Sequence, residues 1–373
     1  MSHYINGQAL IQQFESWSPK SLAVEGDKNG LMVGTLNKEI KKVMIALDVL
    51  ENVMNEAIDK EVDLIVAHHP LLFRPLKKID LDTAHGRIVA KAIKHDITIY
   101  AAHTNLDIAK GGVNDMMAEA LGLTETEVLS PTMTTALKKI VIFVPETHVE
   151  NVRNAIGNAG GGHIGNYSHC TFNSKGQGTF RPEEGTNPFI GEQGTLEFVD
   201  EVKIETIVPA SLQNKVIKAM LKAHPYEEPA FDLYPLDNQG EVLGLGRIGK
   251  LPSGMTLGAF AEHVKQAFDV QGARVVGDLT ANVQKVAVLG GDGNKYMKDA
   301  IFKGADVFVT GDVYYHVAHD AMMDGLNIVD PGHNVEKIMK NGVKTFFDEF
   351  LQKSKYRTEV IVSEPNTDPF QFV

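Results

Sequence analysis

The sequence has almost no cysteine: Cys170 is the only one in 373 residues. This excludes an intramolecular disulfide and a zinc site built from several thiolates. The chain also lacks any run of about 18 apolar residues, the length that a membrane-spanning helix needs. Its amino terminus, MSHYINGQALIQQFESW, has neither the basic nor the apolar region of a secretion signal. We therefore expect a cytoplasmic protein without a membrane partner.

Basic side chains are also in deficit. Lys and Arg together number 36 against 48 Asp and Glu, which gives a formal net charge of −12. Because nucleic acids are bound mainly through Lys and Arg, this balance argues against a nucleic-acid partner. Apolar residues, at 43% of the chain, and 14 histidines are present in quantity. The length suggests two or three domains with substantial cores.

Both ends of the chain alternate short apolar runs with segments of helical periodicity. Because this alternation is typical of a parallel sheet covered by helices, we predict two similar βαβ-rich halves of one α/β domain. The predicted strands are 41–48, 62–70 and 97–107 in the first half, and 285–293, 305–312, 327–333 and 357–364 in the second. The predicted helices are 50–61, 84–95 and one after Gly111 and Gly112, then 294–303, 314–323 and one ending near 352.

The middle of the chain follows a different pattern. A strand, a helix, two alternating stretches around the loop 180–194, a second helix and a last strand follow one another. The order β-α-β-β-α-β is that of a ferredoxin-like α+β unit. We therefore predict a first half of a metal-binding domain over 1–132, an inserted ferredoxin-like domain over 133–239, and the second half over 240–373.

The pair His68-His69, followed by Pro70, ends the apolar run 62–67. In an open parallel sheet, ligands bind beyond the carboxyl ends of the strands, so a histidine pair there is well placed to bind a metal. Neighbouring residues on a strand point to opposite faces, so both can reach one metal cluster only if the chain leaves strand geometry. Pro70 favours such a departure. The alternative is a polar strand end with satisfied imidazoles.

The next strand ends in His103-Thr104-Asn105-Leu106-Asp107. One carboxylate can give an oxygen to each of two divalent ions about 3.5 to 4 Å apart, so Asp107 is a candidate bridging ligand. Alternatively, Asp107 caps the turn that precedes Gly111 and Gly112.

In the second half, His333 and Glu336 follow the run 327–330. If a helix begins near His333, Glu336 lies one turn on and on the same face. Glu336 is otherwise an acid favoured by the helix dipole. Thr310-Gly311-Asp312, with His316, forms a fourth polar strand end. The convergence of four such ends on one crevice predicts a dinuclear metal site.

Several of these residues also match the sequence motifs of a known protein family. The chain resembles the Ngg-interacting-factor-three-like family, whose members are called GTP cyclohydrolase I type 2 homologues or dinuclear metal-center proteins. The resemblance rests on Asp27-Lys28-Asn29-Gly30-Leu31 with Val33-Gly34, Ala46-Leu47-Asp48, His68-His69-Pro70, His103 to Asp107, Gly290-Gly291-Asp292-Gly293, Thr310-Gly311-Asp312, and the closing His-to-Glu element.

The resemblance implies metal ligands at His68, His69, Asp107, His333 and Glu336, and a homohexamer. It also implies that the insert resembles the signal-transduction and copper-tolerance type of ferredoxin-like domain. One departure is that many members have four residues from the last His to the Glu, whereas His333 to Glu336 is three.

Nitrogen and carboxylate ligands suit two divalent ions per chain, with zinc first and iron, manganese or nickel as alternatives. Open coordination positions predict a metal-dependent hydrolase that activates water against a nucleotide-like, cyclic amide or phosphoester small molecule. His103 and His316 are the candidates for moving protons, or else they orient other groups. GTP ring opening rests on the resemblance alone, because no Walker sequence is present and the glycines at 290–293 are only a weak phosphate signal.

The competing function is a metal-binding regulatory or assembly protein whose insert senses a small ligand. Two clusters in the insert deserve comparison with the main site. His224 to Glu228 is a possible ligand set, although a helix end followed by a turn explains it better. His163, His169 and Cys170 are a weaker soft-metal candidate, because neighbouring strand residues face opposite ways.

Overall fold

The computed structural model describes residues 3–373, which form two compact units. One unit comprises the chain up to Thr132 together with Leu243–Val373, and the other comprises Met133–Val242. Two long strands, β7 (Thr124–Pro145) and β10 (Phe231–Thr256), run from one unit into the other. The second unit is therefore inserted into the first. None of the helices in residues 3–373 is both long and apolar enough to cross a bilayer.

The first unit contains a five-stranded sheet with four parallel strands and one antiparallel edge strand. Its spatial order is β15 (Glu359–Val362), β4 (Lys42–Ala46), β5 (Leu64–Ala67), β6 (Thr98–Ala101) and β2 (Gly30–Val33). The run at 357–364, which the sequence placed with the second half, thus pairs with β4 of the first half. Strands β1 (Ile5–Asn6) and β3 (Glu39–Ile40) form a separate two-stranded antiparallel sheet.

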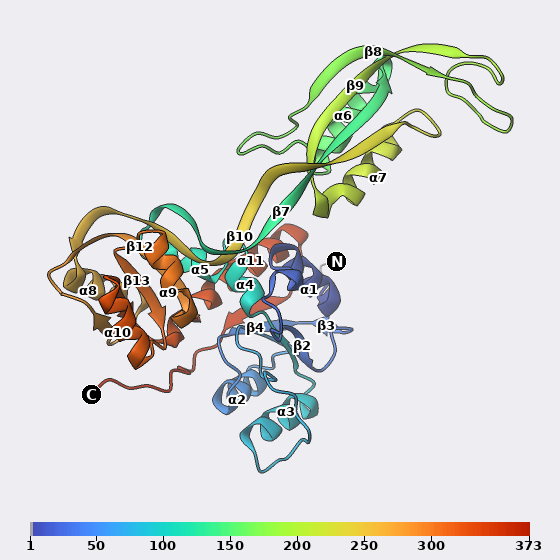
Figure 1. The fold of residues 1–373 in the computed structure, drawn as a ribbon. Helices are drawn as coiled ribbons and strands as arrows, with labels where there is room; N and C mark the ends of the chain where they lie inside the picture. Colours follow the sequence, from blue (N-terminus) through green and yellow to red (C-terminus); the bar gives the residue numbers. More distant parts are fainter. Residues whose placement is uncertain (1–2) are drawn as a thin grey trace. The chain divides into compact units, whose positions relative to one another are not determined.

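Side chains of β4 alternate between two hydrophobic cores. Val43 and Ile45 pack into a central core, whereas Met44 and Ala46 pack into a second core on the other face. Helices α2 (Glu51–Asp59) and α3 (Ala84–Lys94) cover the second core, and α1 (Gly7–Trp17) and α11 (Met339–Ser354) cover the first (Figure 1). Burial on both faces explains why these strands are continuously apolar.

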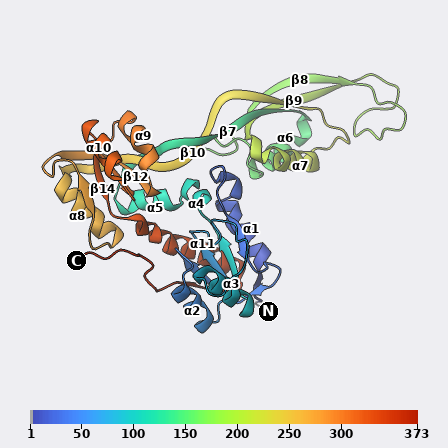
Figure 2. The same ribbon diagram turned by 60° about the horizontal axis from the view of Figure 1, so that its bottom comes forward.

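A second sheet in the same unit has three central parallel strands flanked by antiparallel ones. Its order is β11 (Arg274–Val276), β14 (Asn327–Asp330), β13 (Val307–Gly311), β12 (Asn282–Asp292) and β10. Val288 and Val309 join the central core with α5 (Val113–Ala120) and α8 (Leu257–Phe268). Ala287 and Phe308 face α9 (Met297–Phe302) and α10 (Tyr315–Met323) (Figure 2). The predicted α/β class is confirmed.

The shorter helical segments connect these elements. They are η1 (Lys20–Leu22), α4 (Thr104–Ile108), η2 (Glu146–His148), η3 (Ala210–Leu212), η4 (Asn294–Tyr296) and η5 (His333–Ile338).

In the inserted unit the elements follow the order β7, α6 (Val149–Asn158), β8 (Phe172–Phe180), β9 (Glu197–Pro209), α7 (Gln213–Ala223), β10. The strands lie in the spatial order β10-β7-β9-β8, with β9 antiparallel to both β7 and β8. Ile142 and Ile204 of the sheet share one core with Val152 of α6 and Met220 of α7. The two helices therefore pack on one apolar face of the sheet.

Candidate metal centre

The histidine pair lies where the chain leaves β5. The strand ends at Ala67, and the chain bends over the next two residues. The His68 amide still donates to the Ala46 carbonyl at 3.1 Å, and the His69 amide donates to the Leu47 carbonyl at 2.9 Å. The two imidazole centroids are 5.2 Å apart. The bend thus lets consecutive histidines face the same cluster.

Each of these imidazoles is held through its Nδ1 atom. His68 Nδ1 donates to the Ala102 carbonyl at 2.8 Å, and His69 Nδ1 donates to Asp48 Oδ1 at 2.6 Å. In the second half, His333 Nδ1 donates to Asp312 Oδ2 at 2.7 Å. A partner at Nδ1 fixes the ring and leaves Nε2 for a metal.

Sequence reasoning did not assign these roles to Asp48 and Asp312. Asp312 directly follows β13, and Asp48 lies two residues after the end of β4. This position at the end of a buried strand is the sequence signal from which both roles could have been inferred.

Glu336 lies at the centre of the cluster, with 3% of its surface exposed. Its Oε2 atom is 2.9 Å from His69 Nε2 and 3.2 Å from His333 Nε2. It is 3.6 Å from His68 Nε2. Ligand atoms of His68, His69 and Glu336 lie within 4.8 Å of one another, so the three residues form a group that can hold a metal ion.

The spacing of three between His333 and Glu336 is explained by the local helix type. Both residues belong to η5, a 3-10 helix, rather than to an α-helix. With three residues per turn, side chains at i and i+3 eclipse one another. The pair therefore meets directly, and Gly332, with φ of 88°, makes the turn that leads into it.

Two glycines of β12 make room for this pair. A Cβ atom added to Gly290 would lie 2.8 Å from Glu336 Oε1. One added to Gly291 would lie 2.9 Å from the same oxygen and 3.3 Å from His333 Nε2. The glycines at this strand end therefore serve the close approach of the carboxylate.

Asp107, on α4, completes the buried side of the cluster. Its Oδ1 atom is 3.5 Å from His68 Nε2, and both atoms are buried without a hydrogen-bond partner in residues 3–373. Asn114 holds the segment, because its Nδ2 donates to the Asp107 carbonyl and its Oδ1 accepts from the Gly290 amide, each at 3.0 Å. Unpartnered buried polar atoms are costly, so two that face each other indicate a ligand.

The ionisation of the cluster reflects the competition between burial and charge pairing. Burial opposes a charge on His69, but hydrogen bonds to Asp48 and Glu336 outweigh it and raise the pKa of His69 to about 10. For His333, burial is likewise outweighed by Glu336, and its pKa rises to about 9. Burial raises the pKa of Asp107 to about 6, despite the attraction of His68.

Glu336 behaves in the opposite way to Asp107. Burial opposes its charge, but the surrounding imidazoles hold its pKa well below the usual range. Without a metal ion, the positive charge that balances the Glu336 carboxylate therefore comes from protons on the histidines.

His103 lies at the edge of the cluster. Its ring centroid is 5.4 Å from that of His68 and 5.9 Å from that of His69. His103 Nδ1 donates to Asp27 Oδ1 at 2.6 Å, and the Thr104 amide donates to the other Asp27 oxygen at 3.1 Å. Burial opposes ionisation of Asp27, but hydrogen bonds from His103 and Thr104 hold its pKa well below the usual range.

Comparisons with known proteins identify the family of this chain. The sequence model of the family described as Duf34/NIF3 (NGG1p interacting factor 3) matches residues 5–369. The chain belongs to the Duf34/NIF3 family. Its relatives include proteins named GTP cyclohydrolase 1 type 2 homolog from Halalkalibacterium halodurans, 69% identical over 368 residues and 99% of both chains, and from Bacillus subtilis, 59% identical over 373 residues and 100% of both.

A solved member of the Duf34/NIF3 family has the same fold. The crystal structure of a Bacillus cereus protein related to NIF3 is 63% identical, covers 100% of both chains and superposes with a TM-score of 0.95. The resemblance seen in the sequence motifs is therefore confirmed.

The remaining candidates make other contacts. His316 is exposed on α10, and its ring contacts that of Tyr315, with centroids 5.3 Å apart. In the insert, His224 Nε2 donates to the Phe143 carbonyl at 2.9 Å and its Nδ1 accepts from the Tyr226 amide at 3.1 Å. Both nitrogens of His224 are thus used to hold a helix end and a turn.

The soft-metal candidate has similar local partners. His169 Nε2 is 3.3 Å from Asn158 Oδ1, and the Cys170 thiol contacts the Ser168 carbonyl at 3.9 Å.

Proposed function

We propose that this protein binds two divalent metal ions and acts as a metal-dependent hydrolase on a nucleotide-like, cyclic amide or phosphoester small molecule. The observation that carries the proposal is the pair of facing, unpartnered atoms, His68 Nε2 and Asp107 Oδ1, beside the carboxylate of Glu336. With His69 and His333, these residues form a nitrogen and oxygen donor set that suits zinc, iron, manganese or nickel.

The donor set has a closed side and an open side. His68, Asp107 and Glu336 are buried, whereas His69 and His333 expose 23% and 37% of their side chains. When bound, divalent ions polarise substrate oxygens and lower the pKa of water. Five protein ligands do not fill the coordination of two such ions, so the open side is where water and substrate would enter.

Among the protein groups, His103 is our candidate for proton transfer. The ionised Asp27 carboxylate accepts the Nδ1 proton and so leaves Nε2 of neutral His103 as a proton acceptor. In hydrolysis, Nε2 would take a proton from water as the water oxygen bonds to the carbon or phosphorus under attack, and would return it to the leaving group. Asp27 is then a positioning residue. The exposed His316 is the second candidate.

Metal content tests the first part of the proposal. We expect about two divalent ions per chain by elemental analysis and native mass spectrometry. His69→Ala and Asp107→Asn should lower this number, and His316→Ala should leave it unchanged. A stoichiometry of one in the wild-type protein would refute the dinuclear site.

Turnover tests the second part. Nucleoside triphosphates including GTP, cyclic nucleotides, phosphodiesters and cyclic amides would be screened with fully metal-loaded protein. For a substrate that is turned over, His103→Gln should lower kcat, whereas metal content stays constant. Absence of turnover above Asp107→Asn, with metal bound to the wild-type protein, would refute the hydrolase.

The second candidate function is a metal-binding regulatory or assembly protein. It is favoured by a cavity in the inserted unit. We take the inserted unit to be ferredoxin-like, because its strand order places its first and third strands at the centre of the sheet. In that case a ligand of the insert would alter the properties of the metal-loaded protein without turnover.

The family resemblance also leads us to propose a cytoplasmic homohexamer. Analytical ultracentrifugation of the full chain tests the assembly, and a stable monomer or dimer would contradict it.

A further inference from the structure

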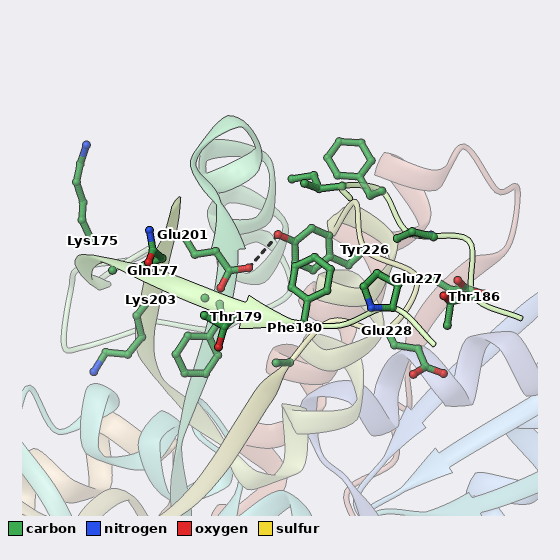
Figure 3. A pocket seen from close by; sticks show the side chains of 18 of the residues that line it. Lys175, Gln177, Thr179, Phe180, Thr186, Glu201, Lys203, Tyr226, Glu227 and Glu228 are labelled. Atoms are coloured by element: carbon green, nitrogen blue, oxygen red, sulfur yellow. Dashed lines mark hydrogen bonds between the residues drawn. The ribbon is translucent and has the colours of Figure 1, made fainter. Parts of the chain in front are cut away.

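The inserted unit contains a cavity of about 790 Å³. Every residue that lines it lies between Phe143 and Ala230, so the inserted unit forms it alone. Strand β8 and the loop that follows it supply one wall, and the turn after α7 supplies another (Figure 3). Cavities of roughly 300 to 1,000 Å³ are the usual size for small-molecule sites.

Four aromatic residues line this cavity, and three of them are in contact with one another. The Tyr226 ring contacts those of Phe180 and Phe189, with centroid distances of 6.0 and 6.3 Å. Both pairs are tilted, by 55° and 48°, rather than stacked. His148 packs edge-on against Phe189 at 5.3 Å and supports it. The rings thus form an aromatic wall.

A buried carboxylate stands beside the aromatic wall. Glu201, on β9, is 8% exposed, and its Oε1 atom accepts the Tyr226 hydroxyl proton at 2.9 Å (Figure 3). Burial, together with this hydrogen bond, raises the pKa of Tyr226, which keeps its hydroxyl a donor. A Cβ atom added to Gly178 would lie 2.1 Å from Glu201 Oε2. The carboxylate therefore occupies space that a side chain at position 178 would take.

The charge of the lining is negative. Four glutamates line the cavity, against the two lysines Lys175 and Lys203. Both lysines pair with acids that are not part of the lining: Lys175 with Glu146 at 2.7 Å and Lys203 with Glu205 at 3.0 Å. The lining glutamates, Glu184, Glu201, Glu227 and Glu228, are therefore the charges offered to a ligand.

From this combination we infer that the cavity binds a small planar organic cation of the amidinium or guanidinium class. The faces of aromatic rings attract such cations. A carboxylate pairs with two parallel N–H groups of an amidinium through charge-assisted hydrogen bonds. An anion would be repelled by the lining glutamates, and a neutral ring would leave the charge of Glu201 uncompensated. This site is independent of the metal centre.

Isothermal titration calorimetry of the full-length, metal-loaded protein tests the site with benzamidinium as the probe. Benzamide, which has nearly the same shape but no charge, is the matched ligand. We expect benzamidinium to bind at least ten times more tightly than benzamide. Equal affinity for the two would overturn the inference, and so would no binding of benzamidinium.

Variants locate the binding. Glu201→Gln retains an acceptor for the Tyr226 hydroxyl and should weaken benzamidinium binding at least tenfold. The exposed Glu228→Gln, which cannot disturb the core, should weaken it severalfold. Glu150→Gln, an exposed acid of the insert outside the lining, and His69→Ala at the metal centre should not change it. Binding that survives Glu201→Gln and Glu228→Gln, or that is lost in His69→Ala, would refute this assignment.

Discussion

Asp107→Asn should make the metal-free protein more stable at pH 8 while removing much of its stabilisation by metal. The carboxyl is buried, and burial raises its pKa from an ordinary 3.8 to about 6. Each factor of ten in the ionisation constant corresponds to about 1.4 kcal/mol, so ionising Asp107 costs the fold about 3 kcal/mol. Asparagine has nearly the same shape and carries no charge, so this cost disappears.

The sign of the pH dependence of stability follows from proton binding to Asp107. Between pH 3.8 and about 6 the folded protein holds a proton on Asp107 that the unfolded chain releases. The stabilising contribution is therefore present at low pH and is lost as pH rises through the folded pKa. Between pH 5 and pH 8 the wild-type protein should lose about half of this contribution, whereas the variant should not.

Metal reverses the order of stability. A ligand at 100 times its dissociation constant stabilises the folded state by about 2.7 kcal/mol per site. The wild-type protein should gain this stabilisation, and Asp107→Asn should lose most of it.

Urea unfolding measures both effects through the fluorescence of Trp17. This is the single tryptophan of the chain, and it lies in the same unit as the candidate metal centre, stacked on Phe346 at 4.7 Å. Unfolding would be followed at pH 5 and pH 8, with EDTA and with zinc. Asp59→Asn, which removes an exposed acid of α2, is the charge-matched control. A metal-free Asp107→Asn protein that is less stable than wild type at pH 8, or an unchanged gain from zinc, would refute the reasoning.

Three further predictions concern the same centre. Zinc binding at pH 7 should release at least two protons, because His69 and His333, with pKa values of about 10 and about 9, are protonated in the metal-free cluster. Burial opposes a charge on His68, but Asp107 and Glu336 raise its pKa as well, so this ring can add to the release. Titration calorimetry in buffers of different ionisation enthalpy measures the release, and a binding enthalpy that is the same in all buffers would contradict it. Gly290→Ala should abolish metal binding, measured by elemental analysis, because the added methyl group would meet the carboxylate of Glu336. The control is Gly176→Ala, which has open space around it and should bind metal normally. Equal metal content in the two variants would show that the close approach at Gly290 does not matter. Asp48→Ala should weaken zinc affinity about 10 to 100-fold in a competitive chelator titration, because the His69 ring loses the acceptor that fixes its orientation. An unchanged affinity would exclude that role.

Local sequence patterns were sufficient for the class of fold and for three residues, His68, His69 and Glu336, that the structure brings together as a group that can hold a metal ion. Continuous apolar runs such as 64–67 predict strands buried on both faces, and the structure has β5 there with both faces in cores. Polar residues that end these runs, such as His68 and Asp107, indicate the edge of the sheet where ligands bind. Both inferences use information within a few residues, since strand periodicity and turn chemistry are local properties.

Long-range pairing was not predictable in this way. The strand at 359–362 joins the sheet of the first half, although its neighbours in sequence lie in the second. The carboxylates that orient His69, His103 and His333 are separated from them by 21, 76 and 21 residues. Nothing in the local pattern distinguishes these acids from other acids at strand ends, because their role depends on which atoms they face.

The sequence by itself determined that the protein has an α/β framework with imidazoles and carboxylates at its strand ends, because backbone periodicity and side-chain chemistry are encoded residue by residue. Only the tertiary structure decided that Glu336 is the centre of the cluster, that Gly290 makes room for it, and that Glu201 stands beside an aromatic wall in the insert. Those facts depend on distances between side chains that are far apart in the chain, and such distances are set only when the elements pack.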